Sequence, residues 1–204
     1  MTRVGAGRVL GLCASLLSFC AVAAPERDQG ARVALDAGRE LVAGGRTGPR
    51  VSARCEVYEP GTNRWRATGA LHTPRASAAA VRLEDGRVLV VGGVTRGARV
   101  LASAEVYSPT SGRWSRGAPL AEAREDPAVV RLLDGRVLVV GGVDAERRPV
   151  RSAELYDPKR DAWTRAAPPR ATRRGAHSGV LLDDGRALFV SGLQAEVYSP
   201  ASDT

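Results

Sequence analysis

Lysine, histidine, cysteine and aromatic residues are all scarce in this chain of 204 residues. Of its 30 basic residues only Lys159 is lysine, which leaves 29 arginines, and aromatic residues make up 4%. A buried core must therefore be built mainly from Val, Leu and Ala. The arginine bias is typical of GC-rich genomes, and the arginines are spread among Asp and Glu. The formal charge of +8 thus indicates a solvated arginine surface, and we expect no nucleic-acid partner.

Sequence motifs of the common enzyme classes are also missing. The chain contains no GxSxG nucleophile motif, no HExxH zinc motif and no P-loop spacing. His72 and His177 fall in or near loops that lead to a first strand of the repeat described below. Their positions in that repeat are not equivalent, which favours loop histidines over metal ligands. We therefore expect no catalytic residues, no metal site and no cofactor.

The first 23 residues have the layout of a secretory signal peptide. Arg3 and Arg8 precede an apolar stretch over 9–22, and an Ala-Val-Ala triplet ends at Ala23. The apolar stretch is too short to span a membrane comfortably. We expect cleavage after Ala23 and export of residues 24–204 to the periplasm, the outer surface or the extracellular space.

The cysteines exclude an intramolecular disulfide in the exported chain. Cys13 and Cys20 lie in the predicted signal peptide, so only Cys55 remains after cleavage. A lipid anchor on Cys20 is disfavoured because Phe19 is bulky where such sites carry a small residue. We expect Cys55 to occupy a small buried position rather than to act as a reactive thiol, because the equivalent residues of the repeats are Ala104, Ala153 and Ala195.

An internal repeat organises the rest of the chain. The decapeptide Asp-Gly-Arg-Val-Leu-Val-Val-Gly-Gly-Val occurs at 85–94 and again at 134–143, which is 49 residues later (134 − 85 = 49). The glycine after the aspartate recurs as Gly38, Gly86, Gly135 and Gly185. A Glu-apolar-Tyr triplet recurs and ends at Tyr58, Tyr107, Tyr156 and Tyr198. Seven residues after the first three tyrosines stand Trp65, Trp114 and Trp163. An arginine precedes each di-glycine position by 17 residues, as Arg27, Arg75, Arg124 and Arg174.

Each repeat predicts a four-stranded antiparallel meander. In the third unit, 127–133 and 136–140 are apolar runs divided by an Asp-Gly turn signal. A third run over 152–156 reaches a turn, and Trp163 lies in a fourth strand that ends before two prolines. The second run is apolar at consecutive positions, so both faces of that strand must be covered.

Four-stranded sheets that are covered on both faces and repeated at this period indicate a β-propeller. The chain resembles the kelch family, whose repeat has a di-glycine, a Tyr and a Trp at this spacing, with an Arg ahead of the di-glycine. The resemblance covers nearly all of the chain from Arg27 to Pro200. It implies an all-β partial propeller of about four blades, over 24–70, 71–119, 120–169 and 170–204.

The repeated residues are expected to be structural. Glycine at the end of an inner strand permits close backbone approach, and Tyr and Trp can wedge between blades. The arginine that heads a blade is expected to form a buried polar pair with the Glu before the Tyr. This structural set is Gly44, Gly45, Gly92, Gly93, Gly141, Gly142, Tyr58, Tyr107, Tyr156, Tyr198, Trp65, Trp114 and Trp163.

The fourth unit lacks the Trp of the others, and so its fourth strand is expected to be missing. Kelch propellers usually close a ring of six or seven blades. Two explanations are consistent with this: a second copy or a partner completes the ring, or the chain is a truncated product of a longer reading frame. We favour the second, because the repeat stops within a unit.

Arginines on the loops between second and third strands are the candidate binding residues. Repetition about an axis would gather these loops on one face, for an acidic glycan or an acidic protein as ligand. The opposing interpretation, a solvated arginine rim, is favoured by the arginine bias elsewhere. The loop residues are Arg46, Arg50, Arg96, Arg99, Arg147 and Arg148.

Two functions follow from the sequence. The first is an exported, non-catalytic binding or protein-interaction scaffold. The second is a fragment of a propeller enzyme that acts on carbohydrates, such as one similar to galactose oxidase. The resemblance would then require two His, two Tyr and a nearby Cys at a copper site, and here every Tyr belongs to the repeat signature and Cys55 lies in a predicted strand. We therefore expect the scaffold.

Overall fold

The computed structural model describes residues 28–168, 178–191 and 194–203, which form antiparallel β-sheets and one short 3-10 turn, η1 (Arg96–Ala98). Within this described part, no helix is long and apolar enough to cross a membrane. The predicted signal peptide, Arg27, Arg174 and His177 lie outside the described residues.

Four sheets follow one another along the chain, and each is a blade whose strands pair in sequence order. Blade 1 contains β1 (Ala31–Ala34), β2 (Glu40–Ala43), β5 (Cys55–Glu59) and β6 (Arg64–Thr68). Blade 2 contains β7 (Ala79–Arg82), β8 (Val88–Val91), β9 (Ala104–Ser108) and β10 (Arg113–Gly117). Blade 3 contains β11 (Ala128–Arg131), β12 (Val137–Val140), β13 (Ala153–Asp157) and β14 (Ala162–Ala166). Blade 4 has three strands, β15 (Ser178–Leu181), β16 (Ala187–Ser191) and β17 (Gln194–Tyr198).

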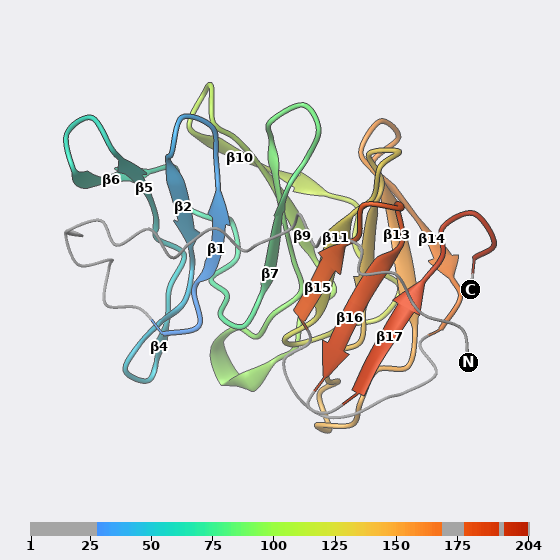
Figure 1. Ribbon diagram of the computed structural model, residues 1–204. Coiled ribbons are helices and arrows are strands. Elements are labelled where there is room, and N and C mark those ends of the chain that lie inside the picture. The colour runs from blue at the N-terminus through green and yellow to red at the C-terminus, as the bar shows by residue number, and fades with distance from the viewer. Residues whose placement is uncertain (1–27, 169–177, 192–193, 204) are drawn as a thin grey trace.

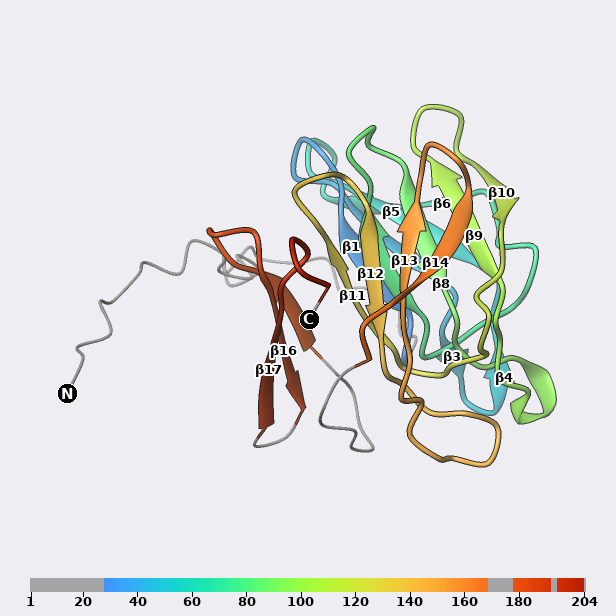
Figure 2. The same ribbon diagram turned by 90° about the vertical axis from the view of Figure 1, so that its right-hand side faces the viewer.

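The blades lie side by side around a common axis, as Figures 1 and 2 show. Their first strands are neighbours in the order β1, β7, β11, β15 and therefore form the inner wall of the arc. The chain thus forms four blades of a β-propeller, and the all-β fold with a three-stranded last blade is confirmed.

The two copies of the decapeptide adopt the same structure. Gly86 and Gly135 make the tight turn between first and second strands with φ of 85° and 84°, which glycine adopts without strain. Asp85 and Asp134 stabilise these turns, since the Oδ1 atom of each accepts the backbone N–H two residues later at 3.0 Å. The Asp-Gly pair therefore fixes the register of the strands that it joins.

The second strands are buried on both faces because each lies between two neighbouring blades. Val88 and Val90 belong to the apolar cluster shared with blade 1, whereas Leu89 and Val91 belong to the cluster shared with blade 3. All four side chains have no exposed area. The consecutive apolar pattern is thus the result of two interfaces, one for each face of the strand.

Two local elements differ from a simple meander. The loop after β2 forms a small hairpin of β3 (Arg46–Thr47) and β4 (Arg50–Val51), and the corresponding loop of blade 2 contains η1. Cys55 is buried in β5, as its alanine equivalents predicted. Blade 1 also differs from the others on the face that points away from blade 2. An ion pair between Arg32 and Glu40 lies there in place of apolar residues.

Candidate functional site

The first glycine of the pairs in blades 1 and 2 permits a close approach between blades. A Cβ added to Gly44 would lie 2.2 Å from the carbonyl oxygen of Arg75, and one added to Gly92 would lie 2.5 Å from that of Arg124. The segment that leads into the next blade therefore crosses directly over the glycine. The backbone N–H of Gly45 donates to the Arg75 carbonyl at 2.8 Å, and that of Gly93 donates to the Arg124 carbonyl at 2.8 Å.

The arginines that head blades 2 and 3 form fully buried ion pairs. Arg75 Nη2 lies 2.7 Å from Glu105 Oε1, and Arg124 Nη2 lies 2.6 Å from Glu154 Oε1. The expected partnership between the head arginine and the Glu before the Tyr is therefore present in both blades. Burial lowers the pKa of each guanidinium, and the attraction of the neighbouring carboxylate opposes that shift.

These pairs are embedded in further hydrogen bonds. Arg124 Nη1 donates to the carbonyls of Gly141 and Ser152, and Arg75 Nη1 donates to those of Gly92 and Ser103. Each arginine thereby joins the ends of the second and third strands of its own blade, while its backbone contacts the preceding blade.

Glu105 and Glu154 also bind the linker that enters their blade. Glu105 accepts the backbone N–H groups of His72 and Thr73 at 2.7 and 3.0 Å, and Glu154 accepts that of Ala121 at 2.8 Å. The His72 ring lies with Nδ1 3.0 Å from Glu105 and is partly exposed, so it has a structural contact. Among the described residues, no group of His, Cys, Asp and Glu side chains could hold a metal ion.

The Tyr and Trp of blades 1 to 3 form a ring pair across the turn between third and fourth strands. The ring centroids are 5.4 Å apart for Tyr58 and Trp65, 5.0 Å for Tyr107 and Trp114, and 4.8 Å for Tyr156 and Trp163. The indole N–H of Trp114 donates to Gly69 O and that of Trp163 to Ala118 O, both at 2.8 Å. The aromatic pairs of blades 2 and 3 therefore connect each of these blades to the one before it.

The tyrosine hydroxyls are held by the same turn. Tyr156 and Tyr198 each donate to an aspartate five residues later, Asp161 and Asp203, at 2.8 Å. Burial, together with these hydrogen bonds to carboxylates, raises the pKa of Tyr198 to about 12 and that of Tyr156 further.

Alkaline pH is therefore expected to destabilise the fold. Because the folded pKa of Tyr198 lies above its ordinary value of 10, its contribution to stability is complete below pH 10 and declines as the pH rises toward 12. Urea unfolding followed by circular dichroism at increasing pH should show this decline, and it should be smaller in Tyr198→Phe. A free energy of unfolding that stays constant through this range in the unsubstituted protein would contradict the assignment.

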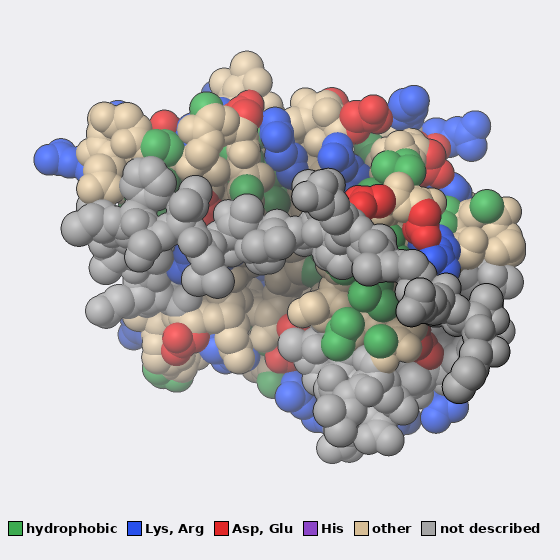
Figure 3. Space-filling view, in the orientation of Figure 1, with side chains coloured by type: hydrophobic (Ala, Val, Ile, Leu, Met, Phe, Trp, Pro, Cys, Tyr) green, Lys and Arg blue, Asp and Glu red, His purple; other side chains and the backbone are tan. Residues whose placement is uncertain are grey.

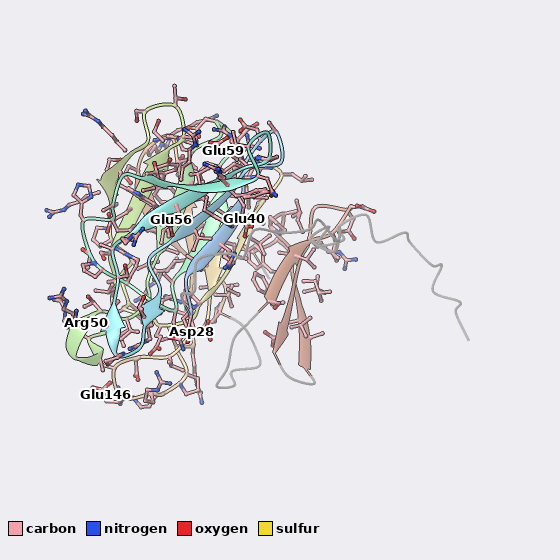
Figure 4. All side chains as sticks on the ribbon, turned by 90° about the vertical axis from the view of Figure 1, so that its left-hand side faces the viewer. Asp28, Glu40, Arg50, Glu56, Glu59 and Glu146 are labelled. Carbon is pink, nitrogen blue, oxygen red and sulfur yellow. The ribbon has the colours of Figure 1, made fainter. Side chains whose placement is uncertain are left out.

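The candidate arginine loops all lie at one end of the molecule. In Figure 2 the hairpin of β3 and β4, the turn η1 and the loop between β12 and β13 extend from the same end. Figure 4 places Arg50 at that end together with Asp28 and Glu146, and places Glu59 at the opposite end. We call the end formed by these three loops the loop face.

The loop face divides into a paired and an unpaired part. In blade 3, Arg147 forms an ion pair with Glu125, and Arg148 forms ion pairs with Asp144 and Glu146 at 2.8 and 2.7 Å. In blade 1, Arg46 Nε donates to Gln29 Oε1 at 2.9 Å. The remaining candidates are exposed and have no side-chain partner within the part of the chain that the structure describes: Arg50, Arg96 and Arg99.

Next to the inner strands, the loop face contains a small polar pocket that sequence reasoning missed. Gln29, Ser77 and Asp126 line it and adopt positive φ values of 57°, 50° and 56°. Their backbones form a chain between blades, since Ser77 N donates to Gln29 O and Asp126 N donates to Ser77 O at 3.0 and 2.8 Å. The pocket has a volume of about 310 Å³, and Glu125 and Arg147 border it. Their common position could have been recognised in the sequence, because each of the three residues stands two positions after a head arginine.

Comparisons with known proteins agree with this architecture. Residues 74–121 and 127–170 match the family described as Kelch motif. Among 328 solved chains with significant structural similarity, the one titled "Structure of YjhT" superposes with a TM-score of 0.72 over 87% of this chain and 69% of that chain. The sequence identity is 16%, so this likeness concerns the fold. A comparison with curated proteins gives no match. The two motif matches, together with the blades, the di-glycines and the Tyr–Trp pairs, show that the chain contains kelch motifs and that these form blades of a β-propeller.

Proposed function

We propose that this protein is an exported, non-catalytic binding scaffold that recognises an acidic glycan through its loop face. The observation that carries the proposal is the group of Arg50, Arg96 and Arg99, which are exposed on neighbouring loops of blades 1 and 2 without an acidic partner among the described residues. Export is supported by the layout of the first 23 residues.

The division of the loop face sets where an anion would bind. In blade 3 the carboxylates of Asp144, Glu146 and Glu125 occupy the guanidinium groups of Arg147 and Arg148. The positive potential of the loop face is therefore concentrated on blades 1 and 2, where Arg50, Arg96 and Arg99 have no carboxylate partner among the described residues. Unpaired arginines attract anions and form two hydrogen bonds with a carboxylate or sulfate group.

The composition of the loops favours a glycan over a protein as ligand. Protein interfaces are usually anchored by aromatic side chains in their centre. Here every aromatic residue of the described part belongs to a blade strand, and the three unpaired arginines are flanked mainly by Gly, Ala, Thr and Pro. A surface with charge but without aromatic anchors suits a hydrated, extended polyanion.

Binding of polygalacturonate and of neutral dextran, measured by isothermal titration calorimetry, tests the proposal. We expect saturable binding of polygalacturonate at about 0.02 M salt that weakens strongly at about 0.5 M, and no binding of dextran. The variant Arg96→Ala/Arg99→Ala should bind about tenfold more weakly, because it loses two exposed ionic contacts of up to about 1 kcal/mol each.

The variant Arg147→Ala/Arg148→Ala is the matched control, since it removes the same charge from the equivalent loop of blade 3. It should bind polygalacturonate almost as well as the unsubstituted protein, because Arg147 and Arg148 are already neutralised by carboxylates before they are replaced. Equal losses in the two variants would show that only net charge matters and would refute the assigned site. Absence of binding at low salt would refute the glycan ligand. If an acidic protein binds to the loop face instead, the ligand of the site is a protein.

A further inference from the structure

The fourth strands of blades 1 to 3 carry arginine side chains on the outer circumference of the molecule. β6, β10 and β14 are the outermost strands of their sheets. Their sequences contain arginine but no Asp or Glu. In the space-filling view of Figure 3, basic side chains project from the outline of the molecule beside β6. These exposed residues, which we call the rim arginines, are Arg64, Arg66, Arg113, Arg116 and Arg165.

The rim arginines have no ion-pair partner within the part of the chain that the structure describes. Glu59 lies opposite Arg64 in the strand register, but no ion pair joins the two side chains. Glu105 and Glu154 lie opposite the last arginines of β10 and β14. Both of these carboxylates are buried and paired with the head arginines, so they are not available to the rim.

The arginine bias of the chain does not explain why the rim is unpaired. Arginines in the turns between first and second strands are also partly exposed, and each forms an ion pair with the aspartate two residues earlier. The distances are 2.7 Å for Arg87 and Arg136 and 2.6 Å for Arg186. The chain therefore neutralises its arginines at these turns and leaves them unneutralised on the rim, where positive potential accumulates.

Residues outside the described part cannot supply the carboxylates that the rim lacks. These residues are 1–27, 169–177, 192–193 and 204, and Glu26 is the one acidic side chain in their sequence. A single carboxylate cannot neutralise five guanidinium groups. The positive charge of the rim therefore does not depend on where these residues lie.

The three strands follow one another end to end around the circumference. The N–H of Gly69, after β6, donates to the carbonyl of Gly112, before β10, at 3.0 Å. The N–H of Ala118, after β10, donates to Asp161 Oδ1, before β14, at 2.9 Å, and this carboxylate also accepts the Tyr156 hydroxyl. Because a strand of five residues spans about 17 Å, the rim arginines form a long row of charges over three blades.

The shape of the rim favours a flexible linear polyanion over a flat membrane or a protein. The blades lie around a common axis, so their outer strands face in different directions (Figure 2). A flat surface would contact the arginines of one or two blades, whereas a polymer chain follows all three. Aromatic anchors for a protein are missing from the described rim, because Trp114 is buried and Trp65 and Trp163 pack against tyrosines.

We propose that the rim arginines form a second binding track for acidic polysaccharide, one that requires a chain long enough to pass over at least two blades. Each carboxylate or sulfate group of the polymer accepts hydrogen bonds from one guanidinium. Because successive sugars are linked, each contact raises the effective concentration of the next. The ligand class rests on the proposed function, whereas the site and its dependence on polymer length do not.

Polygalacturonate and trigalacturonate, titrated into the whole protein at about 0.02 M salt by isothermal titration calorimetry, test the track. The variant Arg66→Ala/Arg113→Ala loses one rim arginine from each of two blades and should bind polygalacturonate about tenfold more weakly. It should bind trigalacturonate as the unsubstituted protein does. The trimer is too short to pass over two blades, so linked contacts add nothing to its affinity.

The variant Arg87→Ala/Arg136→Ala is the matched control. It removes the same charge from blades 2 and 3, at arginines that are already paired with aspartates. Its affinity for polygalacturonate should change by less than about twofold, because these charges contribute little beyond their pairs. Thermal melting verifies that both variants are folded.

Equal affinities of the rim variant and its control for polygalacturonate would overturn the track and leave the loop face untouched. If the rim variant also became less soluble, its arginines would serve only to protect strand edges from association. Binding of phosphatidylglycerol vesicles that depends on the rim, without such dependence for polygalacturonate, would make a membrane the partner and overturn the proposal.

The loop face and the track fail in different ways. The loop-face proposal alone fails if Arg96→Ala/Arg99→Ala binds polygalacturonate as tightly as its own control while the rim variant is weakened. The track alone fails if the rim variant is unaffected while the loop-face variant is weakened. A protein that binds neither sugar overturns both.

Discussion

Replacing Arg124 with alanine is expected to lower the free energy of unfolding by about 3–5 kcal/mol, because it leaves a buried carboxylate without its cation. Arg124 and Glu154 are almost completely buried, and the distance between Nη2 and Oε1 is 2.6 Å. The same change removes the guanidinium donors to the carbonyls of Gly141 and Ser152. The ends of the second and third strands of blade 3 would lose their common partner.

Arg136→Ala is the matched control for this experiment. Arg136 also forms an ion pair in blade 3, with Asp134 at 2.7 Å, but both side chains are more than one third exposed. Pairs of this kind contribute about 0–1 kcal/mol, because water solvates the separated charges well. Urea denaturation of both variants measures the difference. Similar losses would mean that burial does not set the role of the head arginines.

The repeated architecture could be predicted because it depends on residues that recur in the sequence. Two copies of one decapeptide gave the turn and the second strand, and the consecutive apolar run indicated a neighbour on each side of that strand. The Tyr–Trp pairing followed from a spacing of seven residues across a tight turn. These features depend on residues that are close in the sequence. Because the repeat is regular, each blade places them at equivalent positions, so no knowledge of long-range contacts is needed to predict them.

The chemistry of the loop face could not be predicted in the same way. The six candidate arginines look alike in the sequence, but Arg147 is neutralised by Glu125, which lies 22 residues earlier, and Arg46 contacts Gln29, which lies 17 residues earlier. These contacts depend on how each loop folds, and the three loops differ in length and form. Arg32 and Glu40 of blade 1 are visible in the sequence as charged residues. The structure was needed to show that both lie on the face that points away from blade 2.

Arg124 links the interior of blade 3 to the contact between blades 2 and 3. The Arg124 side chain holds blade 3 together, while its carbonyl oxygen accepts the N–H of Gly93 in blade 2. One residue therefore stabilises a blade and the contact between two blades. This dual role explains why the glycine before Gly93 has no room for a side chain.

Gly92→Ala should accordingly destabilise the protein by about 2–5 kcal/mol. Its φ of 68° costs an alanine roughly 1–2 kcal/mol, and its Cβ would lie 2.5 Å from the Arg124 carbonyl oxygen, which adds about 1–3 kcal/mol of overpacking. This contact cannot be relieved by rotation of a side chain, because the obstructing atom belongs to the backbone. The linker would have to move away and lengthen its hydrogen bond to Gly93.

Gly97→Ala separates the two contributions, because Gly97 has a φ of 69° but no atom within 4 Å of an added Cβ. It should cost only the conformational part, roughly 1–2 kcal/mol. Both substitutions restrict the unfolded chain to the same degree, so that effect cancels in the comparison. The difference between their unfolding free energies in urea then measures the close approach between blades 2 and 3. A difference near zero would mean that the linker gives way at no cost, and that the di-glycine is needed only for its backbone angles.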